Sequence, residues 1–166
     1  MRRLFSAALA VMTAGALFAA EEESAPYPRN YLSLAGSLVL PQGGSRLNRL
    51  GGAALRGGHY LSESFALEAE AAWLENRCAL AVRSLIHFSA WEEFDLLFGC
   101  ERLSPFFTVG ARVYFPSGQV GPEVGVGALY YLTDEWALRG EAGAVLGLDT
   151  RVEMVYALSL GLQYSF

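Results

Sequence analysis

Few side chains in this sequence have the chemistry that catalysis or metal binding requires. The two cysteines, Cys78 and Cys100, could form a disulfide, and with His59 and His87 they provide the thiol and imidazole groups of the chain that could bind a metal. Cys78 opens one predicted extended segment, whereas Cys100 falls in the connection that follows it, roughly a membrane thickness away. We therefore expect both thiols to be unpaired and no metal or other cofactor to be bound.

Charged side chains are the other candidates, and they recur at alternate positions beside glycine and alanine. Glu68 and Glu70, for example, are separated by Ala69 and flanked at the next alternate positions by Ala66 and Ala72. Small residues beside charges of both signs suit a crowded polar interior, in which each buried charge has a partner. The predicted interior charge network has four residues of each sign: Arg56, Glu68, Glu70, Arg83, Arg112, Glu123, Arg139 and Glu141.

An alternating pattern predicts the elements that position these charges. In the last stretch, Arg151–Phe166, every second residue from Met154 to Phe166 is apolar, and most residues between them are small or polar. This period of two is typical of a β-strand. The same pattern predicts eight strands: Asn30–Leu40, Arg49–Leu61, Ser64–Leu74, Cys78–Trp91, Pro105–Phe115, Val120–Leu132, Glu135–Leu148 and Arg151–Phe166. The pattern lapses between Glu92 and Ser104, where we expect a longer connection.

Composition distinguishes a membrane barrel from a soluble one. Eight strands of about 10 to 13 residues could cross a bilayer at a tilt or form a soluble barrel such as a lipocalin. A water-facing exterior normally carries many lysines, yet the chain has none and is 53% hydrophobic with a mean hydropathy of +0.29. We therefore predict an all-β fold, an eight-stranded antiparallel up-and-down transmembrane β-barrel.

Aromatic residues gather near the predicted strand ends. Membrane barrels place such residues in girdles at the two lipid–water interfaces. Most of those in this chain fall at the ends on the side of the N-terminus, whereas Trp73 and Phe115 belong to the opposite rim. The predicted interfacial girdle comprises Phe65, Trp73, Phe88, Trp91, Phe107, Phe115, Tyr130, Trp136, Tyr164 and Phe166.

The N-terminal residues predict export. Two arginines at positions 2 and 3 precede the apolar stretch Leu4–Leu17, and small residues at 19 and 20 provide a cleavage zone, as in a secretory signal peptide. The predicted organisation is a cleaved signal peptide at 1–20, a short periplasmic segment at 21–29 and an outer-membrane β-barrel at 30–166. The formal charge of −5 argues against nucleic acid as a partner.

The end of the chain carries a family resemblance. Ser159, Gly161, Tyr164 and Phe166 resemble the terminal signal of Gram-negative outer-membrane β-barrels, whose last strand is read by the barrel-assembly machinery. By overall pattern the chain also resembles the small eight-stranded outer-membrane proteins, the OmpX type and the membrane domain of OmpA. The resemblance implies a monomer in the outer membrane that contacts lipid and lipopolysaccharide, with the assembly machinery as its partner during biogenesis.

The pattern favours a structural function over transport or catalysis. A barrel of eight strands is just wide enough to be filled by its own side chains. We therefore expect an envelope-stabilising protein with a side-chain-filled polar interior and no enzymatic activity. A narrow porin-like channel is the first alternative.

A lipid A-modifying enzyme is the second alternative, and it depends on a further resemblance. Lipid A deacylases use a histidine and a serine two residues apart on one strand together with an acidic partner, and His87 and Ser89 have this spacing. His87 is expected to face the interior, however, and no glutamate is clearly placed to orient it. We therefore expect no catalytic residues.

Overall fold

The computed structural model describes residues 30–41, 50–75, 77–88, 102–115, 118–148 and 152–166. The predicted signal peptide at 1–20 and the segment 21–29 lie outside the described residues, as does 89–101. The described chain forms eight β-strands: β1 (Asn30–Pro41), β2 (Leu50–Ser62), β3 (Phe65–Leu74), β4 (Arg77–His87), β5 (Leu103–Phe115), β6 (Gln119–Tyr131), β7 (Trp136–Leu148) and β8 (Val152–Ser165).

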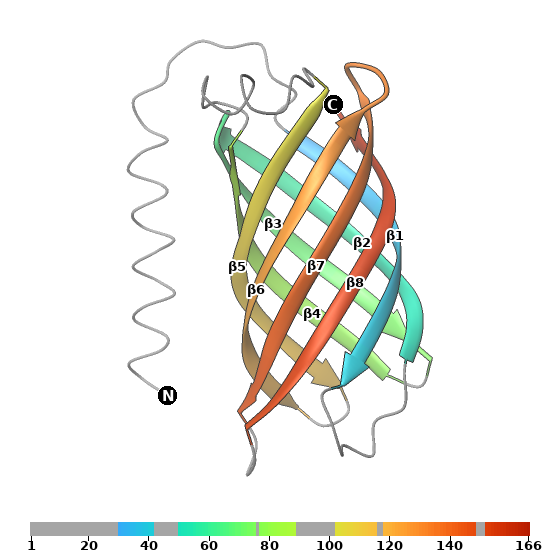
Figure 1. Cartoon of the computed structure of the whole chain (residues 1–166), viewed down its shortest axis with the longest axis vertical. Coiled ribbons are helices and arrows are strands. Elements are labelled where there is room, and N and C mark those ends of the chain that lie inside the picture. The colour runs from blue at the N-terminus through green and yellow to red at the C-terminus, as the bar shows by residue number, and fades with distance from the viewer. Residues whose placement is uncertain (1–29, 42–49, 76, 89–101, 116–117, 149–151) are drawn as a thin grey trace.

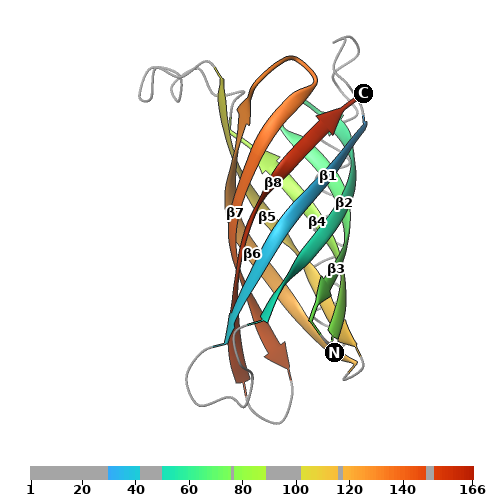
Figure 2. The same ribbon diagram turned by 90° about the vertical axis from the view of Figure 1, so that its right-hand side faces the viewer.

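The eight strands close into a barrel. Each strand pairs antiparallel with the next, and β8 returns to pair with β1 (Figure 1). The closing ladder extends to the chain end, where the Asn30 N–H donates to the Phe166 carbonyl (3.1 Å) and the Phe166 N–H donates to the Asn30 carbonyl (2.8 Å). The strands that form the barrel wall are clearly tilted relative to the barrel axis (Figure 2). The predicted eight-stranded antiparallel up-and-down barrel is confirmed.

We call the end of the barrel that carries Asn30 and Phe166 the near end, and the opposite end, which carries Glu75, the far end. Most strand limits lie within two residues of those predicted. The fourth strand is the exception, because β4 ends at His87, and residues 89–91 of the predicted strand Cys78–Trp91 lie outside the described residues. The Phe88 N–H still donates to the Pro105 carbonyl (3.0 Å), but proline has no N–H to donate in return, so the ladder between β4 and β5 stops there.

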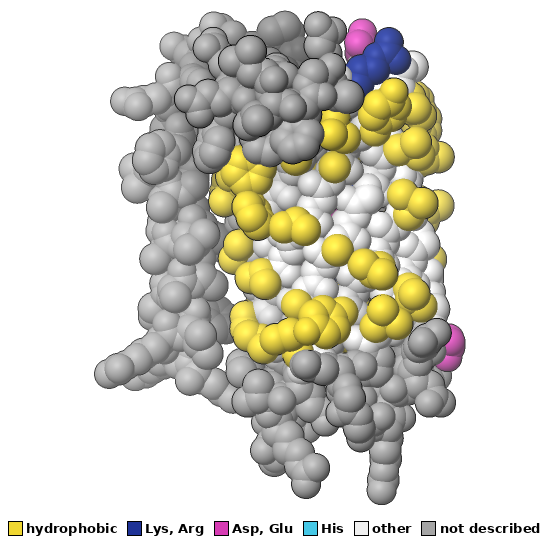
Figure 3. Space-filling view, viewed as in Figure 1, with side chains coloured by type: hydrophobic (Ala, Val, Ile, Leu, Met, Phe, Trp, Pro, Cys, Tyr) yellow, Lys and Arg dark blue, Asp and Glu magenta, His cyan; other side chains and the backbone are white. Residues whose placement is uncertain are grey.

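Alternate residues along each strand face opposite sides of the wall. On β4, for example, Leu80 and Val82 are exposed, whereas Ala81 and Arg83 are buried. Hydrophobic side chains cover the flank of the barrel visible in Figure 3, and charged side chains appear there only near its ends. The apolar face of the strands thus forms an outward belt, as the period of two predicts.

The part of the chain that the structure describes contains no helix long and apolar enough to cross a membrane.

A charge introduced into the middle of the belt tests the outward face. Leu160 lies within β8 and its side chain is 69% exposed. Because this face meets lipid in a membrane barrel, Leu160→Arg should lower the free energy of unfolding by about 2 to 4 kcal/mol. Val120→Arg, near the far end of β6, is the matched control and should cost about 1 kcal/mol or less.

Denaturant titration of the protein folded in lipid vesicles measures both values. Equal stability of Leu160→Arg and the unsubstituted protein would contradict the assignment of this face.

Candidate functional site: the charged interior of the barrel

All eight charged residues predicted for the interior lie inside the barrel and are buried. They come from six neighbouring strands, β2 to β7, and occupy the positions between outward apolar residues. Because alternate residues of a strand face the same side of the wall, all eight charges face the same closed lumen. Four arginines and four glutamates make the set electrically balanced.

Arg83 is the central member of this network. Its side chain is 0% exposed and forms ion pairs with all four glutamates. Nη2 contacts Glu68 and lies 3.0 Å from a carboxylate oxygen of Glu70, whereas Nη1 contacts Glu141 and lies 3.4 Å from Glu123. One guanidinium on β4 is therefore tied to carboxylates from β3, β6 and β7.

Arg112 and Arg56 complete the half of the network toward the far end. Arg112 binds Glu123 through two hydrogen bonds of 3.0 and 2.7 Å and also lies 2.7 Å from Glu70. Arg56 donates to Glu70 from Nε (2.7 Å) and to the Ser159 hydroxyl from Nη2 (2.8 Å). Ser159 is predicted only as part of the terminal assembly signal, and the sequence does not predict its contact with Arg56.

Arg139 connects the network to the near end. It donates to Glu68, to a carboxylate oxygen of Glu141 (3.0 Å) and to the Gln163 side-chain oxygen (3.3 Å). The Tyr31 hydroxyl also donates to Glu68 (2.8 Å). Each glutamate is thus shared by two or more guanidinium groups, which offsets the desolvation cost of burying the charges.

Apolar clusters cover both ends of the charge network. The near cluster combines aliphatic and aromatic side chains, and the far cluster is mainly aliphatic. The near cluster comprises Tyr31, Ala66, Leu85, Phe106, Leu129 and Ala137, with Tyr60 and Tyr131 packed against it. The far cluster comprises Val39, Leu74, Val145 and Val155, with Tyr114 packed against it. The charges are therefore separated from solvent at both ends of the lumen.

Glycine makes room for the large interior side chains. A Cβ atom at Gly110 would lie 2.8 Å from Arg83 Cγ and 2.3 Å from the Val82 carbonyl oxygen. A Cβ atom at Gly58 would lie 2.1 Å from the Tyr31 ring. Only glycine allows so close an approach at these two positions.

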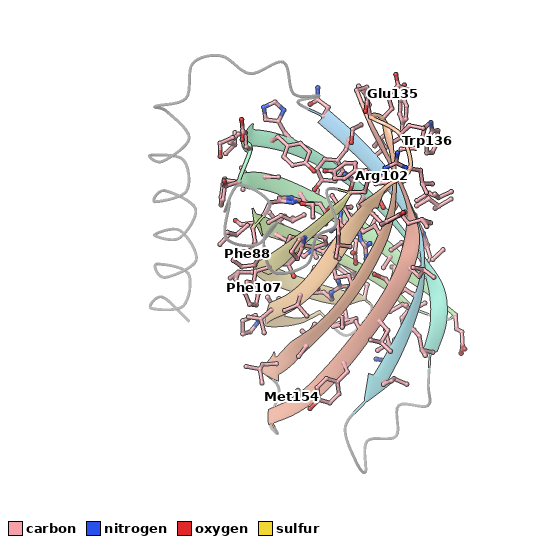
Figure 4. The ribbon with its side chains drawn as sticks, turned by 45° about the horizontal axis from the view of Figure 1, so that its top comes forward. Phe88, Arg102, Phe107, Glu135, Trp136 and Met154 are labelled. Atoms are coloured by element: carbon pink, nitrogen blue, oxygen red, sulfur yellow. The ribbon has the colours of Figure 1, made fainter. Side chains whose placement is uncertain are left out.

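The predicted girdle residues lie near the rims, with one difference. Phe88 contacts Phe107 edge-on with ring centroids 5.1 Å apart, and both lie together on the outside of the barrel (Figure 4). The ring centroids of Trp136 and Tyr164 are 4.9 Å apart on another part of the near rim. Trp73, Phe115, Tyr130 and Phe166 are exposed, and Trp91 lies outside the described residues.

Phe65 is the difference, because its side chain is buried and does not join the exposed girdle. It is the first residue of β3 and follows the turn at which the register between β2 and β3 shifts, between Tyr60 and Ser62. The extra residue lies on β2, and Phe65 keeps its regular pairing with Ile86 of β4, so its burial comes from packing that the alternating pattern alone does not predict.

The residues considered for catalysis do not come together in the described chain. His87 is buried in the lumen, and its Nδ1 atom lies 3.2 Å from the Ser104 hydroxyl, a partner that the sequence did not suggest. Ser89 and Cys100 lie outside the described residues. Cys78 and His59 are exposed, and His59 contacts the Asn30 side chain (2.9 Å). Within the described ranges, no group of three His, Cys, Asp or Glu side chains could hold a metal ion.

Removal of the central arginine tests how much the network contributes to folding. Arg83→Met leaves four buried glutamates opposite three arginines, so it should lower the free energy of unfolding by about 3 to 5 kcal/mol. Arg83→Met combined with Glu141→Gln restores the charge balance and leaves each remaining arginine a glutamate partner. Denaturant titration should find this double variant more stable than Arg83→Met; a double variant of lower stability would contradict charge balance as the cause.

Comparison with known proteins identifies the fold. No family model and no curated protein matches the chain. Among solved structures, the OprG outer-membrane protein of Pseudomonas aeruginosa is similar, with a TM-score of 0.58 and 9% identity over 84% of this chain and 97% of that one. The N-terminal β-barrel domain of OprF from the same organism gives 0.55 and 14% over 82% and 98%. A de novo designed transmembrane β-barrel gives 0.54 and 17% over 87% and 100%. The chain therefore has the fold of the small eight-stranded outer-membrane β-barrels, the OmpA- and OmpX-like type.

Proposed function

We propose that the protein is an integral outer-membrane protein with a structural, envelope-stabilising function and no enzymatic activity. The observation that carries this proposal is the filled lumen, in which eight paired charges lie between two apolar clusters. This packing of the described side chains supports a barrel without a continuous aqueous path for a solute. The barrel would stabilise the membrane as a rigid body with an apolar outer surface.

Location and partners follow from the outward belt and the chain ends. The belt of exposed leucine, valine and aromatic side chains suits contact with lipid and lipopolysaccharide. A signal peptide at 1–20 would direct export, and the barrel-assembly machinery would read the terminal strand through Ser159, Gly161, Tyr164 and Phe166. The barrel is complete as a single chain, which favours a monomer.

The two alternatives are less well supported. A narrow channel would need water along the lumen, yet both end clusters consist of closely packed apolar side chains. A lipid A-modifying enzyme would need an exposed histidine beside an acidic group, yet His87 is 2% exposed and points into the lumen. The packed end clusters therefore do not favour a channel, and the buried position of His87 does not favour an enzyme.

Conductance and envelope integrity together test the proposed function. The folded protein, recognised by a mobility shift on gels after boiling, should give no single-channel steps in a planar bilayer. Cells that lack the protein should become more sensitive to detergent, and expression of the unsubstituted chain should restore resistance, whereas a chain that fails to insert should not. Steady conductance steps would contradict the structural function and favour the narrow channel. Unchanged sensitivity to detergent in cells that lack the protein would contradict envelope stabilisation.

A further inference from the structure

Four rings form a continuous row across the lumen at the near end. The centroids of Tyr31 and Tyr60 are 5.3 Å apart, those of Tyr60 and His87 are 5.4 Å apart, and those of His87 and Phe106 are 5.4 Å apart. The row connects β1, β2, β4 and β5 and belongs to the near cluster or packs against it. Three of its four rings are uncharged aromatic rings, and His87 is the one ring that can acquire a positive charge near neutral pH.

His87 is held in the row as a neutral ring. Its side chain is 2% exposed, Nδ1 lies 3.2 Å from the Ser104 hydroxyl, and Nε2 is buried with no hydrogen-bond partner among the described residues. Protonation would place an N–H on both nitrogens, and within the described part of the chain the proton on Nε2 would have no acceptor. A buried charged donor that lacks an acceptor is strongly unfavourable.

The charged groups nearby would not accommodate this proton. Arg139 on β7 and Glu68 on β3 are the charged groups that act on His87. Arg139 lies 4.9 Å from the Phe106 ring and would repel an imidazolium. Glu68 would attract it, but Glu68 is already bound by Arg83, Arg139 and the Tyr31 hydroxyl.

Among the described residues, the other strands add no buried carboxylate beyond those of the charge network. Tyr60 on β2, Tyr31 on β1 and Tyr131 on β6 are neutral phenols that pack in or against the cluster. On β5, Ser104 and Phe106 carry no charge, and on β8 the buried polar residues are Gln163 and Ser165.

We propose that the row Tyr31–Tyr60–His87–Phe106 is an acid-sensitive seal, which protonation of His87 loosens so that water enters the lumen from the near end. The step is uptake of one proton from solvent onto the imidazole. The far cluster has no histidine, and its core is aliphatic, so the far end stays closed. The device is independent of whether the function of the barrel is structural.

Hydrogen exchange in lipid nanodiscs tests the proposal, with each rate divided by the intrinsic rate at the same pH. Protection of the near-end amides of Tyr60 and Phe106 should fall by about tenfold or more as the pH drops from about 7.5 to about 4, starting near the ordinary imidazole range of about 6.5. Protection around Val145 at the far end should not change.

Two variants isolate the histidine. His87→Gln keeps a polar side chain beside Ser104 but cannot take up a proton, so its near-end protection should stay constant over this pH range. His59→Gln removes the exposed histidine and should respond like the unsubstituted protein. An equal acid response in His87→Gln, an equal response at both ends, or no response at all would overturn the proposal.

A direct measurement covers the case in which His87→Gln does not fold. The chain has two histidines, so His87 is the only one in His59→Gln. Its imidazole resonances should then titrate together with the loss of near-end protection. A ring that stays neutral until the whole barrel unfolds would overturn the proposal.

Discussion

Satisfaction of backbone hydrogen bonds in lipid is the constraint on which this structure depends. An unpaired N–H or C=O group in hydrocarbon costs several kcal/mol, so a membrane-crossing sheet cannot have a free edge. In this chain β8 meets that requirement by pairing with β1 from Tyr31–Ser165 to Pro41–Val155. Closure at eight strands then sets the width of the lumen. Every inward side chain must fit that width, and every inward charge must find its partner within it.

The charge network and the closed wall depend on each other. A slip of one residue in any of the strands β2 to β7 would turn its network charges toward lipid and its outward apolar side chains toward the lumen. Arg83 opposes such a slip because its ion pairs involve three other strands at once. The apolar clusters at both ends keep water away, which strengthens each ion pair and makes any unpaired charge more costly. The network therefore specifies register as well as filling space.

The sequence predicts the wall of this barrel better than its contents. A period of two identifies the strands, the outward face and the eight inward charges without knowledge of any contact. It does not predict that Arg83 meets Glu141, 58 residues away, because that contact depends on tilt and stagger. Nor does it reveal that Pro105 ends β4, since the missing N–H acts across the sheet. Leu85 and Leu129 also occupy inward positions, on the same face of their strands as charged residues. The alternating pattern alone therefore does not predict that they pack together in the near cluster.

The near cluster and the far cluster differ in how they contact the charge network. At the near end Arg139 joins both parts, because its guanidinium lies 4.9 Å from Phe106 and 6.0 Å from Tyr31 while it binds Glu68. A displacement of the near rings must therefore alter the position of a network cation. Val39 and Val155 at the far end have no polar atom in their side chains and can only exclude water. At the near end packing and charge are therefore coupled directly through Arg139, and a disturbance of the rings or of the network affects the other.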